Sequence, residues 1–305
     1  MSRTGLRASK VGSKIPDEER IMISGMPRIA IAVHDFAACV ASFRERLGML
    51  VVDVSESSVK DLGASLAVCV PEGGSNIEIM SPADPSAALS QSLQRFLDRR
   101  GEGLFALMLE ARDPEKEAEV LLDRGLNVLP LMKGAGGHDV HPNSTHGVLI
   151  RVYPVDSFAG YEGTGPTSAE DMPELSGIAR VIIAVDDLDR AVDVYGTRFA
   201  MDMGSPSLDT ERGVQAAICT PASGGVIELV SVRDSQRPFA RSVREFLDSD
   251  REGMFAVVLQ SRDLQASRHA LLARGVEVAP SDESPDVLEI ERGATFGMRV
   301  RIEAI

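Results

Sequence analysis

The sequence predicts an α+β fold made of two tandem copies of one domain, each built from two β-α-β-β-β modules. Three observations predict it: segments of the first half recur in the same order in the second half, apolar runs typical of strands alternate with helical periodicities, and the spacing between matching residues is constant from residue 69 onward. We therefore divide the chain into an N-terminal extension (1–25), a first domain (26–153), a linker (154–176) and a second domain (177–305).

The repeat is visible when the chain is laid on itself. Cys69 then lies over Cys219 and Glu78 over Glu228, which gives an offset of 150 residues. The matched segments are 28–36 with 180–188, 65–81 with 215–231, 93–113 with 243–263, and 146–154 with 296–304. Because the offset stays at 150 from residue 69 onward, the two copies have nearly the same length.

The expected elements follow from apolar spacing. Phe36, Val40, Phe43 and Leu47 recur at helical spacing, while runs such as RIAIAV and NIEIM are typical of strands. The elements predicted for the first copy are a strand at 28–33, a helix at 36–47, strands at 66–70 and 76–80, a connecting helix at about 87–99, a strand at 104–111, a helix at 113–124, and strands at 126–131 and 147–153. The second copy repeats this order.

The composition excludes several classes of protein. Of the 305 residues 44% are hydrophobic, which is enough for packed cores, and no uninterrupted apolar run is long enough to span a membrane. A net charge of −14 argues against nucleic acid and anionic membranes as partners, because both need basic surfaces. Cys39, Cys69 and Cys219 lack metal-type spacing, and the N-terminus lacks an apolar signal segment, so we expect buried thiols and a cytoplasmic protein.

These motifs resemble a known family. The order IAV-x-D-F, LGM, IEIMSP, RGEGLFAL and GAGG…HP-x-S-x-x-GVLI is similar to that of the methylmalonyl-CoA epimerases, within the vicinal oxygen chelate (glyoxalase, bleomycin-resistance and extradiol dioxygenase) superfamily. The resemblance covers 26–153 and, more loosely, 177–305, and the tandem arrangement is also similar to that of type I extradiol dioxygenases. It implies that each copy curls its strands into a half-open barrel around one pocket.

The resemblance also implies a place for a divalent metal, held by four inward-pointing side chains. The residues at those positions are Arg28, Glu78, Ala106 and Arg151 in the first copy, and Arg180, Glu228, Ala256 and Arg301 in the second. A guanidinium has no lone pair to give to a metal, and an alanine side chain has no donor. We therefore predict that neither copy holds the usual metal and that the protein needs no cofactor.

The leading functional hypothesis is a metal-independent isomerase, epimerase or lyase. Arg28 and Arg151, or Arg180 and Arg301, would bind a small carboxylate or an acyl-CoA, because an arginine grips a carboxylate with parallel hydrogen bonds. Two arginines against one glutamate would leave each pocket with a charge near +1. The candidate catalytic residues are Glu78, Glu228 and His141, although paired arginines would favour the ionised glutamate and make it a poor proton acceptor.

Three alternatives remain open. The protein could sequester a small molecule without turning it over, as metal-free members of the superfamily do. It could instead use a shifted metal site that includes His138, His141 or His146, as an epimerase or extradiol dioxygenase. The Arg–Glu pairs could also be purely structural. Since a tandem chain can pair its own domains, we expect a monomer or a homodimer.

Overall fold

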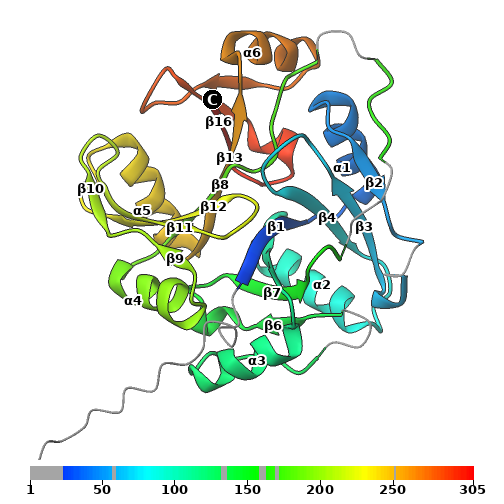
Figure 1. Cartoon of the computed structure of the whole chain (residues 1–305). Coiled ribbons are helices and arrows are strands. Elements are labelled where there is room, and N and C mark those ends of the chain that lie inside the picture. Colours follow the sequence, from blue (N-terminus) through cyan, green and yellow to red (C-terminus); the bar gives the residue numbers. More distant parts are fainter. Residues whose placement is uncertain (1–22, 57–59, 132–135, 158–162, 169–171, 251) are drawn as a thin grey trace, which may run out of the picture.

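The protein forms two mixed sheets, one for each copy, in a computed structural model that describes residues 23–56, 60–131, 136–157, 163–168, 172–250 and 252–305 (Figure 1). The strand order is β2-β3-β4-β1-β5-β7-β6 in the first copy and β10-β11-β12-β8-β13-β16-β15-β14 in the second, where β9 also pairs with β11. Neither sheet closes into a barrel. The predicted tandem α+β fold is confirmed.

The first copy consists of the following elements. Its strands are β1 (Ile23–Ala32), β2 (Val51–Asp53), β3 (Ala64–Cys69), β4 (Asn76–Pro82), β5 (Gly103–Ala111), β6 (His138–Val140) and β7 (Leu149–Pro154). Its helices are α1 (Phe36–Ala41), α2 (Ala88–Arg100) and α3 (Pro114–Asp123), with a π-helical turn η2 (Ser42–Arg46) and 3₁₀ turns η3 (Lys60–Leu62) and η4 (Pro142–Ser144).

The second copy repeats this order with a few additions. Its strands are β8 (Arg180–Ala184), β9 (Asp202–Met203), β10 (Ser207–Asp209), β11 (Val214–Thr220), β12 (Val226–Val232), β13 (Gly253–Ser261), β14 (Val278–Pro280), β15 (Val287–Ile290) and β16 (Val300–Ala304). Its helices are α4 (Leu188–Val192), α5 (Pro238–Asp250) and α6 (Leu264–Ala273), with a π-helical turn η5 (Asp193–Arg198) and a 3₁₀ turn η6 (Arg292–Thr295). The described part of the chain contains no helix long and apolar enough to cross a membrane.

Equivalent aspartates begin equivalent helices in the two copies. Asp35 and Asp187 accept a hydrogen bond from the backbone N–H three residues later at the start of α1 and α4. Asp113 and Asp263 do the same for α3 and α6. Each carboxylate satisfies a backbone donor that the first helical turn leaves free. The same local signal therefore sets the same helix starts twice.

The structure differs from the predicted elements at several boundaries. β1 begins at Ile23, so the predicted domain boundary at residue 26 falls inside a strand, while residues 1–22 lie outside the described part. The predicted helix 36–47 changes from an α-helix to a π-helical turn at Ser42. The predicted strand 126–131 makes only one isolated bridge, between Val128 and Val140, and β6 forms instead at His138–Val140.

The helices that connect the modules lie against the sheet face where the resemblance places a metal pocket. Leu93 and Leu97 of α2 are buried against Ala30 of β1 and Ala106 of β5. In the second copy α5 covers β8 and β13 in the same way. Short alanine side chains leave room for the helix to approach the strands. The predicted pocket in each copy is therefore largely filled by the protein's own apolar side chains.

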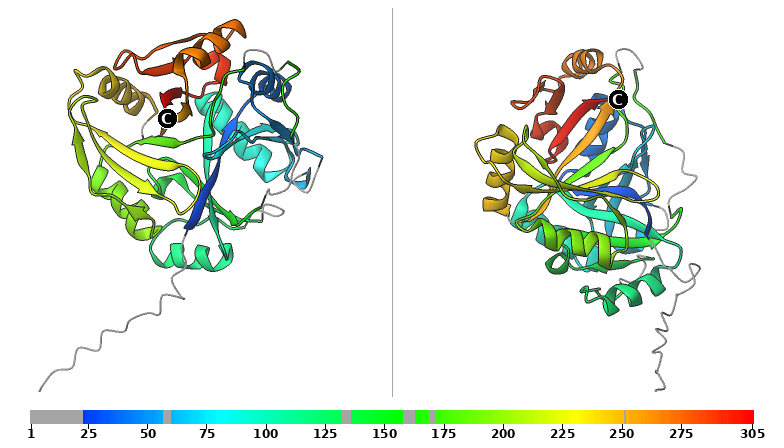
Figure 2. Two further views of the ribbon diagram at one scale, coloured as in Figure 1. Left: turned by 45° about the horizontal axis from the view of Figure 1, so that its top comes forward. Right: turned by 60° about the vertical axis from the view of Figure 1, so that its left-hand side comes forward.

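The opposite faces of the two sheets share one hydrophobic core. Ile31 and Ile79 of the first copy belong to the same buried cluster as Ile183 and Leu229 of the second. The β11–β12 hairpin lies beside the start of β1, where Met26 bridges to Gly224 (Figures 1 and 2). Helices α3 and α6 lie at opposite ends of the molecule. The two copies thus pack as a dimer within one chain.

Candidate functional site

The first pair of predicted site residues is buried. Arg28 on β1 donates through Nε to Oε2 of Glu78 on β4, at 3.0 Å, and each residue is only 2% exposed. The strands that carry them are parallel neighbours. The Arg28 guanidinium also lies over the ring of Tyr153, 5.4 Å from its centre. The predicted proximity of Arg28 and Glu78 is therefore observed, but away from solvent.

Arg151 has a different main partner from the predicted one. Its Nε lies 3.0 Å from Oδ1 of Asp139, which stands directly opposite it on β6. Burial disfavours the charged form of Arg151, but Asp139, Tyr153 and Glu78 together outweigh it and hold the pKa of Arg151 above its usual value. Sequence reasoning missed Asp139 because β6 was not predicted; with that strand in place, its cross-strand position would have shown the pair.

The second copy repeats and extends this arrangement. Nε of Arg180 lies 2.9 Å from Oε2 of Glu228, and Nη2 of Arg180 donates to Oε1 of Glu303 at 2.7 Å. Arg212 supplies a second guanidinium to Glu228. Arg180 is partly exposed, whereas Glu228 is buried.

Arg301 in the second copy matches Arg151 in the first. Its Nη1 donates to Oε1 of Glu289 at 3.0 Å, and its Nη2 pairs with Glu283. Glu289 lies opposite Arg301 on β15, as Asp139 lies opposite Arg151. The cross-strand pair is thus conserved between the two copies of this chain.

These carboxylates change the expected charge of both sites. In the first copy, Arg28 and Arg151 face Glu78 and Asp139, so two positive charges meet two negative ones. In the second copy the arginines meet Glu228 and further carboxylates from Glu283, Glu289 and Glu303. The net charge near +1 that was expected for each pocket is therefore not observed. Each cluster is internally neutralised or acidic.

The residues at the family's metal positions do not fit a divalent ion. Each set offers one carboxylate, and that carboxylate is already bound by a guanidinium; the other positions are arginine and alanine. A divalent ion needs several oxygen, nitrogen or sulfur donors. Within the described residues no group of three or more His, Cys, Asp or Glu side chains is placed to hold a metal ion.

The three histidines proposed for a shifted metal site have separate partners. His138 lies 2.9 Å from Glu115, and Nδ1 of His141 accepts a hydrogen bond from the backbone of Asn143. His146 lies 2.9 Å from Glu252 of the second copy. The predicted histidine cluster therefore does not form a metal site within the part of the chain that the structure describes.

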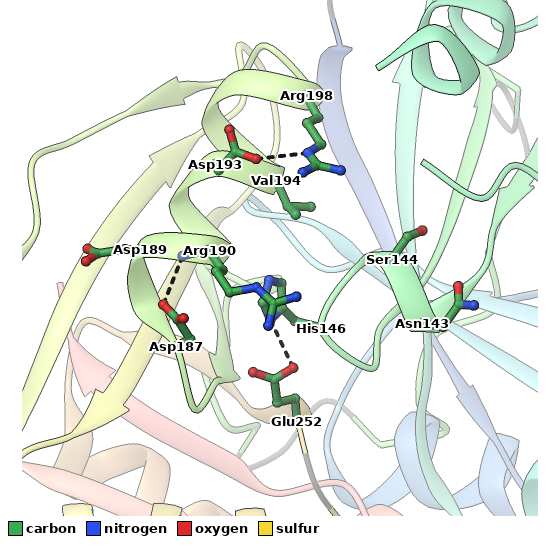
Figure 3. A pocket seen from close by; sticks show the side chains of 10 residues that line it. All are labelled: Asn143, Ser144, His146, Asp187, Asp189, Arg190, Asp193, Val194, Arg198 and Glu252. Carbon is green, nitrogen blue, oxygen red and sulfur yellow. Dashed lines mark hydrogen bonds and ion pairs between the residues drawn. The ribbon is translucent and has the colours of Figure 1, made fainter. Parts of the chain in front are cut away.

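His146 and Glu252 belong to a polar pocket of about 560 Å³ between the copies (Figure 3). The Arg190 side chain points into this pocket, and Arg198 pairs with Asp193 on its far side. Glu252 also accepts the backbone N–H of Asp186, so His146 and the start of α4 share one carboxylate. This pocket mixes both charges, and most of its charged groups are already engaged with each other.

A cleft of about 320 Å³, here called cleft 1, opens between α2 and the starts of β5 and β7 in the first copy. Arg95 and Arg99 lie on its rim one helical turn apart, and His141 lies on the loop across from them. Neither Arg95 nor Arg99 has an acidic partner in the described part of the chain. Its other lining residues are Ser92, Phe96, Arg100, Leu104, Phe105, Leu129, Pro142, Gly147, Leu149 and Met254, so none of the described lining residues is acidic.

The floor of cleft 1 is aromatic. Phe96 and Phe105 meet edge to face, with ring centres 5.3 Å apart. Beneath them, the Arg151 guanidinium lies 5.5 Å from the centre of the Phe105 ring. Phe105 therefore separates the buried ion pairs from cleft 1. The two phenyl rings give the cleft an apolar base beneath a cationic rim.

A cleft beside the corresponding helix of the second copy, cleft 2, shares some of these positions and has a different charge pattern. It measures about 350 Å³ and lies between α5 and β14–β15. Glu245 stands where the first copy has Arg95, and Arg299 stands where it has Leu149. Its charged lining residues are Arg241, Glu245, Asp282, Glu283, Glu289, Arg299 and Arg301. Three arginines thus face four carboxylates, so this cleft does not favour an anion as cleft 1 does.

The predicted site residues therefore fall into two groups. His141 lines cleft 1, and Arg301 lines cleft 2. Glu78 and Arg28 are buried below them, beyond contact with any cleft described above. Sequence reasoning missed the α2 arginines. Their spacing of four residues on an amphipathic helix was the available signal, although Asp98, three residues after Arg95, made an ordinary intrahelical pair equally plausible.

Comparisons with known proteins agree with this fold. The family model described as Glyoxalase/Bleomycin resistance protein/Dioxygenase superfamily matches residues 28–141 and 180–291, which confirms the resemblance seen in the sequence at the level of the superfamily. A search of curated protein sequences gave no significant match.

Solved structures also resemble the whole chain. A mutant of 4-hydroxymandelate synthase from Streptomyces coelicolor is similar over 92% of each chain, with a TM-score of 0.64 and 13% identity. A xylose isomerase-like TIM barrel/4-hydroxyphenylpyruvate dioxygenase fusion protein is similar over 93% of this chain and 49% of its own, with a TM-score of 0.61 and 14% identity. Methylmalonyl-CoA epimerase from Mycobacterium tuberculosis is 23% identical over 43% of this chain and 88% of its own, with a TM-score of 0.36. The first two likenesses show the tandem fold alone.

Proposed function

This chain belongs to the Glyoxalase/Bleomycin resistance protein/Dioxygenase superfamily, and we propose that it binds a small organic anion in cleft 1, with arginines in place of a divalent metal. The observation that carries this proposal is the combination of a cationic rim with an aromatic floor in a cleft whose described lining residues include no carboxylate. Apolar pockets with a few placed polar groups are typical of small-molecule sites, and the volume of about 320 Å³ lies at the small end of their range.

The rim supplies the chemistry that recognises a carboxylate or sulfonate. Arg95 and Arg99 present guanidinium groups that can donate paired hydrogen bonds to an oxyanion. His141 adds a further donor, because its Nδ1 accepts the Asn143 N–H and the neutral ring then carries its proton on Nε2. Phe96 and Phe105 would bury the apolar part of the ligand. An acyl-CoA, as the sequence resemblance implied, would place only its acyl part in a cleft of this size.

Binding without turnover is favoured over the isomerase or lyase hypothesis. An isomerase or lyase that used the predicted catalytic carboxylates would need a substrate carbon beside Glu78 or Glu228. Both carboxylates are buried and engaged by guanidinium groups. A ligand held in cleft 1 would be separated from Glu78 by Phe105 and Arg151. The geometry therefore supports a binding role for cleft 1 better than proton transfer at the Arg–Glu pairs.

The test uses copy-swapped variants of the whole protein. The second copy has Glu245 and Ser249 where the first has Arg95 and Arg99, so the double variant R95E/R99S gives α2 the residues of α5 at these two positions. Anilinonaphthalene sulfonate and phenylbutyrate serve as probes, measured by fluorescence and calorimetry with a chelator present. We expect the variant to bind at least about tenfold more weakly, because charge-assisted hydrogen bonds are worth about 1.5–3 kcal/mol each.

A matched control separates local from general electrostatics. Arg244 on α5 stands where the first copy has Gln94, and its side chain is exposed and lines neither cleft. Arg244→Gln should leave probe binding within about twofold of the wild type. Equal affinity of the wild type and R95E/R99S, or a chelator that abolishes binding, would contradict the proposal.

A further inference from the structure

One wall of cleft 1 comes from the second copy. Met254, the second residue of β13, lines the cleft together with residues of α2, β5 and β7. It is 8% exposed, so part of its side chain reaches the cleft surface. By contrast, the described residues that line cleft 2 all come from the second copy itself. Cleft 1 is therefore completed by the tandem partner, and cleft 2 is not.

The backbone that carries Met254 is fixed against the first copy. A Cβ atom placed on Gly147 would overlap the carbonyl oxygen of Glu252, so these two backbones are already in contact. A Cβ atom placed on Gly253 would lie 3.5 Å from Nη1 of Arg100. Because these backbones are already in contact, we expect the length of the side chain at position 254, rather than a shift of the backbone, to set how far this wall extends into the cleft.

Met254 and the rim arginines line different depths of cleft 1. Arg95 and Arg99 on α2 are exposed, whereas Phe105 and Met254 are largely buried. An anion held at the exposed arginines would therefore direct an apolar tail inward, over Phe96 and Phe105, toward Met254.

We propose that Met254 closes the apolar end of cleft 1 and sets the length of the hydrocarbon part of the bound anion. The ligand class is then a monocarboxylate with a short linear or phenyl-terminated chain. This inference rests on the proposed binding function of cleft 1 and adds a residue that determines specificity. A methionine side chain suits this place, because its flexible thioether packs against ligands of varied shape.

The test is a chain-length series on the full protein. Hexanoate, octanoate, decanoate and dodecanoate displace anilinonaphthalene sulfonate from the wild type, Met254→Ala and Met254→Phe. Each buried methylene should raise affinity about three- to fourfold until the chain reaches Met254. Met254→Ala removes the three side-chain atoms beyond Cβ, so the length of tightest binding should increase by about two or three carbons, and Met254→Phe should not increase it.

A second methionine controls for loosened packing. Met201 is 6% exposed, belongs to the core shared by the copies and lines neither cleft. Met201→Ala should keep the wild-type length preference. If the wild type binds these carboxylates but Met254→Ala keeps the same preferred length, or Met201→Ala shifts it equally, the role of Met254 is disproved while the binding site stands. If the wild type binds none of them and no sulfonate probe, the proposed function and this inference fall together.

Discussion

Asp139 and Arg151 face each other across β6 and β7, with 3.0 Å between Oδ1 and Nε. Glu289 and Arg301 occupy the same cross-strand positions in the second copy. In both copies the arginine on the last strand is held by a carboxylate from its neighbouring strand. The carboxylate already occupies some of the N–H donors of this arginine, so fewer of them remain for a ligand. The cationic rim on α2 is therefore the better candidate for anion binding.

Asp139→Asn should therefore destabilise the protein strongly. Removing one partner of a buried ion pair leaves the other charge without compensation, which costs about 3–5 kcal/mol. Chemical denaturation of the variant and the wild type measures this loss. Glu289→Gln is the matched control. It should cost less, because Arg301 keeps its second carboxylate, Glu283. An equal loss of unfolding free energy in the two variants would contradict this prediction, because the Asp139–Arg151 pair would then contribute no more than the Glu289–Arg301 pair.

The buried pair of Arg28 and Glu78 should behave as a structural unit. We expect Arg28→Met and Glu78→Leu each to cost about 3–5 kcal/mol, because each leaves a buried charge behind. The double variant R28M/E78L should recover most of that loss, since it removes both charges together. Probe binding in cleft 1 should be unchanged in the folded double variant. Loss of binding there would instead place the ligand at the Arg–Glu pair.

Glu117 on α3 should make the stability fall as the pH rises. Its carboxyl group is fully buried and accepts no hydrogen bond in the described structure, and burial raises its pKa. Because the pKa of Glu117 is higher in the folded state, the folded protein binds this proton more tightly than the unfolded chain does. The stability that results is fully present below the unfolded pKa of Glu117 and is lost as the pH rises through its folded pKa. Glu117→Gln removes this loss, so its advantage over the wild type should be larger at about pH 8 than at about pH 4.5.

Thermal unfolding at both pH values measures the effect. Glu119, two residues along the same helix, is exposed, and Glu119→Gln serves as the control. We expect its difference from the wild type to vary little with pH. A Glu117→Gln variant with the same pH profile as the wild type would mean that this carboxyl group titrates normally in the folded protein.

Gly147→Ala should disturb the contact between the copies. Gly147 has a φ of +76°, and a Cβ there would overlap the backbone of Glu252. Gly73 has a similar φ of +73° but no atom within 4 Å of the added Cβ. Both variants should lose about 1–2 kcal/mol from backbone strain, and Gly147→Ala should lose more because of the overlap. Similar unfolding midpoints for the two variants would indicate that the backbones at this contact between the copies move apart at little cost in free energy.

The sequence predicted the architecture well because its signals are local or repeated. The constant offset from Cys69 to Cys219 identified the tandem copies, and apolar spacing identified the main helices and most long strands. The buried cysteines were also predicted correctly. The residue types alone predicted that the arginines and alanines at the family's metal positions would not ligate a divalent ion. The structure adds that the one carboxylate at these positions in each copy is paired with an arginine.

The site was harder to predict because it depends on strand register and on which face a helix covers. Leu93 and Leu97 indicated that α2 buries one face, but not that it fills the side of the sheet where a pocket was expected. The role of Asp139 required knowing that β6 pairs with β7. Arg95 and Arg99 read as ordinary exposed charges until the structure placed them above Phe96 and Phe105.

The most direct test of the central claim is a crystal structure of the protein with phenylbutyrate. We predict that the carboxylate lies within hydrogen-bond distance of Arg95, Arg99 or Nε2 of His141, and that the phenyl ring lies against Phe96 and Phe105. A carboxylate bound instead to a metal ion, or seated outside cleft 1, would contradict the account.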